Sequence, residues 1–206
     1  MYPPLCVQCQ EITEGPPLCP HCYQEIQYPW QQPQLKLAPL CIDEFFTAML
    51  YEPPITHLIH QIKYKRLAPL APFAAELLYD SVYLPLPDLV TAVPLHKDRE
   101  RWRGFNQSEL IAKKYSALIA RPYIRTLTRI EETPTQASLK LRKERLSNLA
   151  KSFQPLPALN TTALQNKHIL LIDDVATTGT TLNECSKVLK QLGATKITGL
   201  TLAHGS

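Results

Sequence analysis

The sequence of 206 residues contains no run of eighteen or more apolar residues, which excludes a recognisable transmembrane helix. It also lacks the charged start and apolar stretch of a signal peptide, since it opens Met-Tyr-Pro-Pro-Leu. No internal repeat and no low-complexity tract is present. We therefore expect a cytoplasmic protein that does not insert into a membrane.

The composition predicts a globular chain, because 45% of the residues are hydrophobic and only 19% are charged. The net charge of +4 is compatible with a polyanionic partner but does not by itself indicate one. Fifteen of the nineteen prolines lie at or before Pro94, so the first part should be rich in loops. From residue 89 onward, short apolar runs alternate with helical patterns, as in α/β proteins.

One stretch, residues 168–193, combines an apolar run, two carboxylates, a loop of small and hydroxyl residues, and a helical pattern. The apolar run predicts a buried strand that ends before the carboxylates, and the spacing from Leu182 to Leu192 predicts a helix. The free N–H groups at the start of that helix would face an anion, and Gly179 permits close approach. The loop has no lysine before its last threonines, so a nucleoside-triphosphate P-loop is not indicated.

Two carboxylates beside a phosphate need a task of their own, because they repel it. Carboxylates accept hydrogen bonds from vicinal hydroxyls and bind Mg²⁺, and a phosphate beside a diol describes a ribose 5-phosphate. The alternative is an acidic turn followed by an ordinary helix cap, where Asp and Thr are common. The candidate binding residues are Asp173, Asp174, Val175, Ala176, Thr177, Thr178, Gly179, Thr180 and Thr181.

Four of the six cysteines form two Cys-x-x-Cys pairs, Cys6 with Cys9 and Cys19 with Cys22. In a reducing compartment such pairs indicate metal ligands before disulfides, and this spacing is that of a zinc ribbon. The zinc would be structural, because four thiolates close its coordination and supply folding energy to a small segment. Four unmetallated thiols are the alternative, and His21 is a second candidate for one ligand position.

A helix is predicted over residues 55–62, where four apolar residues share one face, and a second over residues 73–79. The first ends in the basic run from Lys63 to Arg66. Cations at a helix C-terminus are favourable without any ligand, and we prefer this interpretation to a phosphate contact.

Residues 89–94 predict a buried strand, and a strongly cationic segment follows it. We interpret residues 95–103 as a cationic loop at the carboxyl end of a strand, where α/β proteins bind ligands. A helix capped by Asn106 follows, and Trp102 or Phe105 could stack on a base. A solvated turn offset by Asp98 and Glu100 is the alternative. The candidate contacts to nucleic acid or pyrophosphate are Arg99, Arg101, Arg103, Gly104, Asn106 and Gln107.

A second basic block near residue 143 adds three candidates for the same contacts, Arg142, Lys143 and Arg145. Runs of cations are most often solvated faces, which remains the alternative here. Residues 154–166 have the composition of a linker, and residues 196–203 predict a last strand.

Two motifs resemble known families. Residues 169–181 are similar to the phosphoribosyl pyrophosphate (PRPP) motif of type I phosphoribosyltransferases, in which the acidic pair holds the ribose hydroxyls and the loop holds the 5′-phosphate. Together with the cysteine pairs, residues 101–107 (Arg-Trp-Arg-Gly-Phe-Asn-Gln) and residues 133–153, nearly the whole chain resembles the ComF family of competence proteins. The resemblance implies a mainly parallel sheet flanked by helices, with a zinc ribbon over residues 1–35 and a phosphoribosyltransferase-like domain over residues 36–206.

Three hypotheses for function follow. In the first, a ComF-like protein with a PRPP or related nucleotide site handles incoming single-stranded DNA in natural transformation. In the second, the protein is an active, Mg²⁺-dependent phosphoribosyltransferase that acts on an acceptor base we cannot name. In the third, the ribbon docks onto another competence protein.

Overall fold

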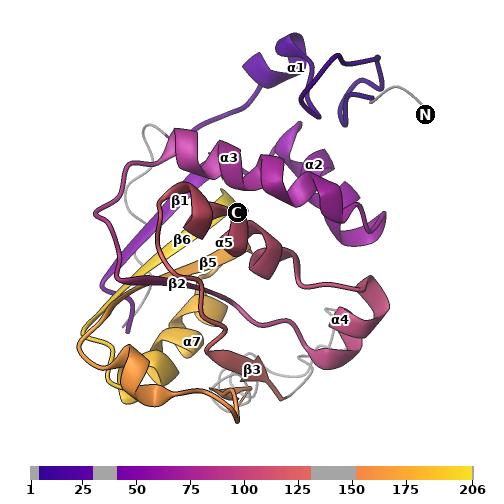
Figure 1. The fold of residues 1–206 in the computed structure, drawn as a ribbon. Helices are drawn as coiled ribbons and strands as arrows, with labels where there is room; N and C mark the ends of the chain where they lie inside the picture. The colour runs from indigo at the N-terminus through magenta and orange to yellow at the C-terminus, as the bar shows by residue number, and fades with distance from the viewer. Residues whose placement is uncertain (1–4, 30–40, 131–151, 206) are drawn as a thin grey trace.

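The computed structural model describes residues 5–29, 41–130 and 152–205. Its centre is a four-stranded parallel sheet with the strand order β1-β6-β5-β2 (Figure 1). The four strands are β1 (Glu44–Leu50), β2 (Leu89–Ala92), β5 (His168–Ala176) and β6 (Lys196–His204). This confirms the predicted α/β class, and places β5 and β6 in the middle of the sheet.

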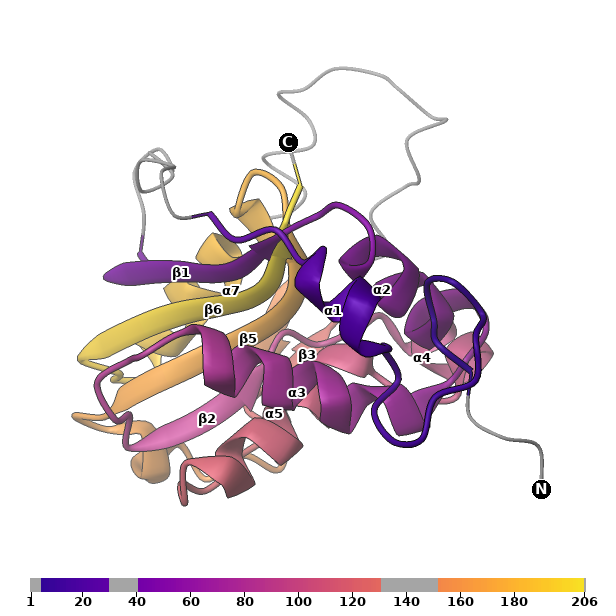
Figure 2. The same ribbon diagram turned by 90° about the horizontal axis from the view of Figure 1, so that it is seen from above.

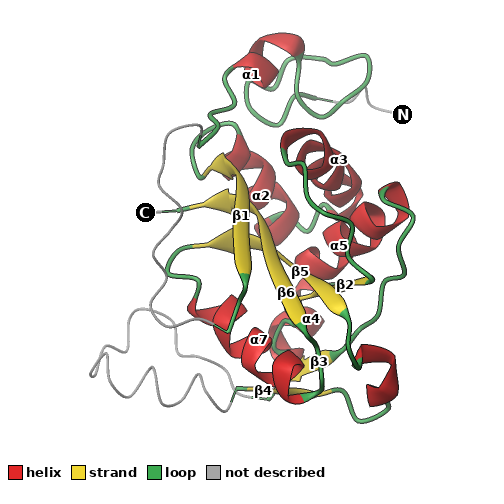
Figure 3. Ribbon diagram, turned by 90° about the vertical axis from the view of Figure 1, so that its left-hand side faces the viewer, coloured by secondary structure: helices red, strands yellow, loops and turns green. Residues whose placement is uncertain are grey.

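Helices cover both faces of the sheet (Figure 3). The first face carries α2 (Ile55–Tyr64), α3 (Ala71–Ser81) and α5 (Gln107–Leu118), and the second carries α7 (Thr180–Gln191). The remaining helices and strands among the described residues are shorter: α1 (Pro20–Gln24), η1 (Ala68–Leu70), α4 (Lys97–Arg103), η2 (Thr161–Leu164), and the antiparallel pair β3 (Leu127–Arg129) and β4 (Phe153–Pro155).

Strand β5 shows why both faces are covered. Leu170 and Ile172 contribute to the core beneath α2, α3 and α5, whereas Ile169 and Leu171 contribute to the core beneath α7. Because successive side chains of a strand point to opposite faces, a continuous apolar run buries a strand on both sides. Residues 168–172 therefore specify a central strand.

The cysteine-bearing segment packs against the same layer as α2 and α3 (Figure 2). The Gln61 side-chain amide donates to the Val7 carbonyl at 3.4 Å, and the Leu50 amide donates to the Gln27 carbonyl at 2.9 Å. The boundary that we expect near residue 35 falls outside the described residues. Within the described part of the chain, no helix combines the length and the apolar character needed to span a bilayer.

Three predictions from the sequence need correction. Strand β5 continues through the two aspartates to Ala176, because its pairing with β6 extends to Ala176 opposite His204. The predicted cationic loop is the helix α4, with acidic residues in its first turn, arginines in its last turn, and Gly104 at φ 88° as its C-cap. Residues 154–166 are not merely a linker, since they contain most of β4 and all of η2.

Candidate functional site

Asp173 and Asp174 lie near the carboxyl end of the central strand β5, where parallel α/β sheets place their ligands. Both side chains are buried, with 9% and 5% of their surfaces exposed. Buried carboxylates require hydrogen-bonding or charged partners, so their neighbours define what the site can hold.

Several of those neighbours come from the segment 103–108, whose Arg103, Gly104, Asn106 and Gln107 the sequence predicts as contacts to nucleic acid or pyrophosphate rather than to the aspartates. The Ser108 hydroxyl donates to Asp173 Oδ1 at 2.7 Å, and the Gln107 amide donates to Asp174 Oδ1 at 3.4 Å. Arg103 in turn donates to the side-chain oxygen Oε1 of Gln107. Asn106 fixes this segment, because its amide donates to the Val93 carbonyl at 2.9 Å while its oxygen caps α5 through the Ser108 amide at 3.1 Å.

The second partner of the acidic pair is Lys63, from the last turn of α2. Its Nζ lies 2.5 Å from Asp174 Oδ2, and its side chain is only 19% exposed. The interpretation of Lys63 as a helix-end cation therefore needs correction, because the side chain pairs with Asp174. One signal was present: Lys63 follows Ile59 by four positions and therefore lies on the buried side of the helix.

The charges of this cluster depend on one another. Burial raises the pKa of Asp173 to about 7, with the negative charge of Asp174 as the next cause. For Lys63, burial alone would lower the pKa, but the attraction of Asp174 outweighs it and raises the pKa. Burial lowers the pKa of Arg103. The acidic pair therefore has cationic neighbours within the protein itself.

The loop after β5 forms the other half of the site. Gly179 adopts φ 68° and begins α7, whose start has no capping side chain and no acidic residue in its first turn. The hydroxyls of Thr178 and Thr180 lie 2.7 Å apart. A hollow of about 50 Å³, lined by Asp173 and residues 175–182, opens there, several times the roughly 10–15 Å³ that one water needs. Such a hollow, rimmed by hydroxyls and helix N–H groups, suits a phosphate group.

The remaining candidates lie in different environments. Arg103, Asn106 and Gln107 are buried in the network around the aspartates, whereas Gly104 is exposed. Arg101 is exposed and lies 3.1 Å from Asp98, and Arg99 is half-buried. Trp102 is 52% exposed, but Phe105 packs against the core and offers less surface for stacking. Arg142, Lys143 and Arg145 lie outside the described residues.

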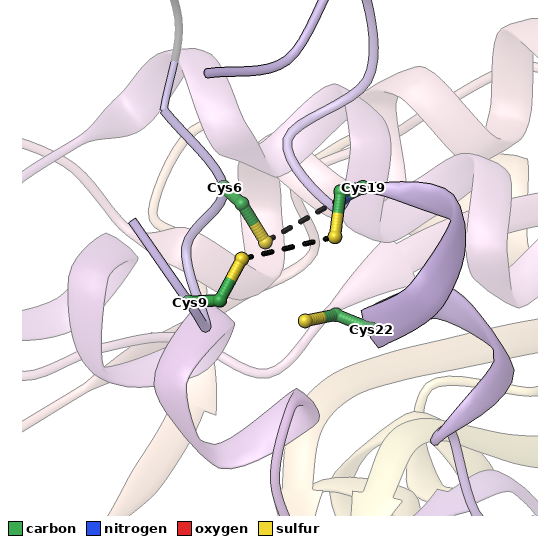
Figure 4. A group of neighbouring side chains, drawn as sticks. All are labelled: Cys6, Cys9, Cys19 and Cys22. Atoms are coloured by element: carbon green, nitrogen blue, oxygen red, sulfur yellow. Dashed lines mark hydrogen bonds between the residues drawn. The ribbon is translucent and has the colours of Figure 1, made fainter. Parts of the chain in front are cut away.

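The four cysteines of the two Cys-x-x-Cys pairs converge, as predicted. Figure 4 shows their sulfur atoms pointing toward a common centre, and all four lie within 4.8 Å of one another. The Cys9 and Cys19 sulfur atoms are 3.8 Å apart, which is about the separation expected around a tetrahedral zinc with Zn–S bonds of about 2.3 Å. The Cys19 amide donates to Cys6 Sγ at 3.5 Å. Although burial opposes the change, backbone hydrogen bonds led by that of Cys19 lower the pKa of Cys6 to about 6.

This geometry allows the four cysteines to hold a metal ion. Among the residues that the structure describes, no other group of three or more metal-ligating side chains converges in this way. His21 lies next to Cys22 in the chain, but its ring contacts Glu25 at 3.5 Å. The alternative ligand position that the sequence left open for His21 is therefore not needed.

Comparison with known proteins gives a consistent family assignment. Residues 105–205 match the family model described as the phosphoribosyl transferase domain. The chain is 34% identical to competence protein F of Haemophilus influenzae over 203 residues, which covers 94% of this chain and 87% of that protein. It is 33% identical to the DNA utilization protein YhgH of Salmonella typhi over 204 residues, covering 94% of this chain and 81% of that protein.

A shorter similarity reaches the competence protein ComFC of Bacillus subtilis. The identity is 30% over 125 residues, which covers 60% of this chain and 48% of that protein. The similarities to the first two proteins, in contrast, span nearly the whole chain.

Proposed function

Because the chain belongs to the ComF family of competence proteins, we propose that it binds a ribose 5-phosphate ligand, PRPP or a related nucleotide, and handles incoming single-stranded DNA in the cytoplasm. In this proposal Asp173 and Asp174 accept the ribose hydroxyls. The loop from Val175 to Thr181 holds the 5′-phosphate, with the N–H groups at the start of α7 as its main donors.

One observation carries the proposal: a paired carboxylate and an anion-sized hollow adjoin at one strand end. A phosphate alone would explain the loop but not the carboxylates, and a bare cation would explain the carboxylates but not the uncapped helix. A sugar phosphate with a vicinal diol accounts for both. The contacts of Lys63 and Ser108 also reduce the repulsion between the carboxylates and an anionic ligand.

We further propose that the four cysteines hold a structural zinc ion. Their spacing, their convergence and the chemistry of four thiols fit zinc, which prefers sulfur ligands in closed sites. Magnesium is expected to arrive with PRPP, since Mg²⁺ is commonly held by one or two carboxylates together with substrate phosphates. Asp173 and Asp174 are the candidate carboxylates for it.

Calorimetry provides the test of the ligand. Wild-type protein, titrated with PRPP in the presence of Mg²⁺, should bind, and the double variant Asp173→Asn/Asp174→Asn should bind at least about tenfold more weakly. Asp80→Asn, an exposed aspartate at the end of α3, is the matched control and should bind as the wild type does. Equal affinity of the double variant would remove the acidic pair from the proposal. A parallel titration with single-stranded DNA tests the second part, which predicts binding that weakens as salt rises.

The match of residues 105–205 to a phosphoribosyl transferase domain favours a second candidate function, catalysis. A nitrogen nucleophile would displace pyrophosphate from the ribose through an oxocarbenium-like state. Residues 93–103 follow the neighbouring strand β2 and would meet the pyrophosphate, so that their cations oppose its growing negative charge. Release of pyrophosphate from PRPP in the presence of nucleobases, lost in Asp173→Asn/Asp174→Asn, would establish turnover. If PRPP binds but no pyrophosphate is released, only the binding function is supported.

A further inference from the structure

A groove of about 590 Å³ lies between the cysteine-bearing turns and the C-terminal half of α2. Gln8 and Gln10 line it from one side, and His60 and Tyr64 line it from the other. Lys65 also lines it, and no carboxylate is among the described residues that do so. The groove therefore offers rings, amides and a cation, a chemistry that favours an anionic partner with flat apolar faces.

Tyr64 is the principal ring of this groove. It is 57% exposed, although most tyrosines of a globular protein bury more of their surface. The His60 ring meets it edge-on, with the ring centroids 5.2 Å apart and an angle of 86° between the planes. Such a T-shaped pair is a favourable aromatic arrangement, and it leaves more than half of Tyr64 exposed.

Arg66, which follows the groove residues Tyr64 and Lys65, has an unusual backbone conformation and extends this surface. Arg66 adopts φ 58°, a left-handed value that costs a side-chain-bearing residue about 1 kcal/mol or more. In this position its guanidinium lies over the Trp102 ring of α4, 4.6 Å from the centroid. Trp102 nevertheless remains 52% exposed. Trp102 is therefore a second exposed ring besides Tyr64, and the cation Arg66, two residues after Tyr64, lies against it.

From this arrangement we propose that an aromatic–cationic surface, formed by His60, Tyr64, Lys65, Arg66 and Trp102, binds single-stranded nucleic acid. Bases stack on Tyr64 and Trp102, and backbone phosphates meet Lys65 and Arg66. Unpaired strands are the partner because stacking on an exposed ring requires a base whose face is free. The inference rests on the proposed handling of DNA and gives it a location different from the buried arginine of the acidic site.

Two observations separate this surface from the ribose-phosphate site. DNA has no 2′-hydroxyl, so an acidic pair that accepts a vicinal diol has no such group to hold along a DNA strand. The side chains at the end of α2 also point in different directions. Lys63 contacts the buried Asp174, whereas Tyr64 and the two residues after the helix, Lys65 and Arg66, are exposed. The strand would therefore pass beside the sugar-phosphate site without occupying it.

The test is the fluorescence anisotropy of a labelled twelve-base oligothymidylate with the full-length protein. Tyr64→Ala and Trp102→Ala should each weaken binding by about tenfold, which is the usual effect of removing one stacking ring. Lys65→Ala should reduce the dependence of log affinity on log salt by about one. Tyr83→Ala and Arg121→Ala are the controls, because both residues are exposed and lie toward the opposite end of the sheet. Tyr83 stands between α3 and β2, and Arg121 follows α5.

The outcomes distinguish the proposed aromatic–cationic surface from the proposed handling of DNA. If the wild type binds the oligonucleotide and the Tyr64 and Trp102 variants bind it equally well, this surface is overturned while DNA handling stands. If the wild type does not bind, DNA handling itself fails, and the inference with it. Equal binding of duplex DNA or of polyglutamate would also overturn the surface, since neither offers unpaired bases. PRPP affinity, measured on the Tyr64 and Lys65 variants, should stay at the wild-type value.

Discussion

The cysteine cluster and the acidic pair are both groups of ionisable side chains, but their surroundings differ in charge. Residues 1–35 contain no lysine and no arginine, so the four thiols have no cation of their own segment nearby in sequence. The acidic pair, in contrast, has Lys63 at 2.5 Å from Asp174 and Arg103 linked to it through Gln107. The cysteine segment carries no lysine or arginine of its own, whereas the acidic pair already has a cationic partner.

This difference indicates different ligands. Four thiolates in a segment without lysine or arginine favour a metal ion, which both neutralises them and crosslinks a segment with little core. Two carboxylates that are already offset by a lysine can remain beside a phosphate, and they favour the neutral hydroxyls of a sugar. The four expectations that follow test this contrast, beginning with the largest effect.

Removal of the metal should unfold the cysteine segment. Zinc contributes about 10–16 kcal/mol to the folding of small zinc-binding peptides, so Cys9→Ser should abolish binding of one metal ion per chain. Residues 5–29 should then become sensitive to protease while the sheet persists. Elemental analysis and limited proteolysis provide the measurement. Cys41→Ser, which lies outside the cluster, is the control. A wild type that carries no metal and resists protease equally after chelation would contradict the contrast.

Loss of Lys63 should destabilise the protein far more than loss of an exposed lysine. Lys63→Met leaves a buried carboxylate without its cation, which typically costs about 3–5 kcal/mol in the free energy of unfolding. Lys114→Met is the matched control, because its pair with Glu76 is partly exposed and is worth about 1 kcal/mol or less. Urea unfolding measures both. The further change Asp174→Asn in the Lys63→Met protein should recover part of the loss, and a fully additive double variant would show that the two residues do not interact.

Asp173 should make the unliganded protein less stable as pH rises. Its pKa is raised by burial from 3.8 to about 7, so between these values the folded state holds a proton that the unfolded state has released. The free energy of unfolding attributable to this group therefore falls from about pH 4 to pH 7 and is level above, a change on the order of a few kcal/mol. Asp173→Asn should flatten that slope in urea unfolding series. An unchanged slope would show that Asp173 titrates normally.

The smallest effect is expected at the phosphate loop. Gly179→Ala introduces a side chain at φ 68°, which should cost about 1 kcal/mol in stability and weaken PRPP binding by displacing the start of α7. Gly15→Ala is the control, since an added methyl group there meets nothing within 4 Å and its backbone is not left-handed. Thermal unfolding and calorimetry measure the two effects. Equal behaviour of both variants would argue against a conformational need for Gly179.

Much of the site was predictable because its residues are contiguous. The aspartates with the loop to Thr181, and the segment from Arg103 to Gln107, each form one short motif, and strand ends bring such motifs together. Strand β1 was missed because its sequence, Glu-Phe-Phe-Thr-Ala-Met-Leu, does not alternate and stands at the sheet edge. The pairing of Lys63 with Asp174 joins residues far apart in the chain, and only the buried position of Lys63 on its helix indicated that a partner was required.

The helix α4 shows a different limit of sequence reasoning. Its many charges suggested a loop, since charged runs are usually solvated. The structure shows a helix that has Asp98 and Glu100 in its first turn and Arg101 and Arg103 in its last turn, with Arg103 buried. The order of the charges, rather than their number, carried the information.

The central claim is that the acidic pair accepts a vicinal diol while the neighbouring loop holds a phosphate. Calorimetry with ribose 5-phosphate and 2-deoxyribose 5-phosphate tests it most directly, because the two ligands differ in one hydroxyl and share the phosphate. We expect the wild type to bind the deoxy sugar about tenfold or more weakly, the usual loss of a hydrogen bond to a charged group. The difference should disappear in Asp173→Asn/Asp174→Asn. Equal affinity of the wild type for the two sugars would contradict the claim.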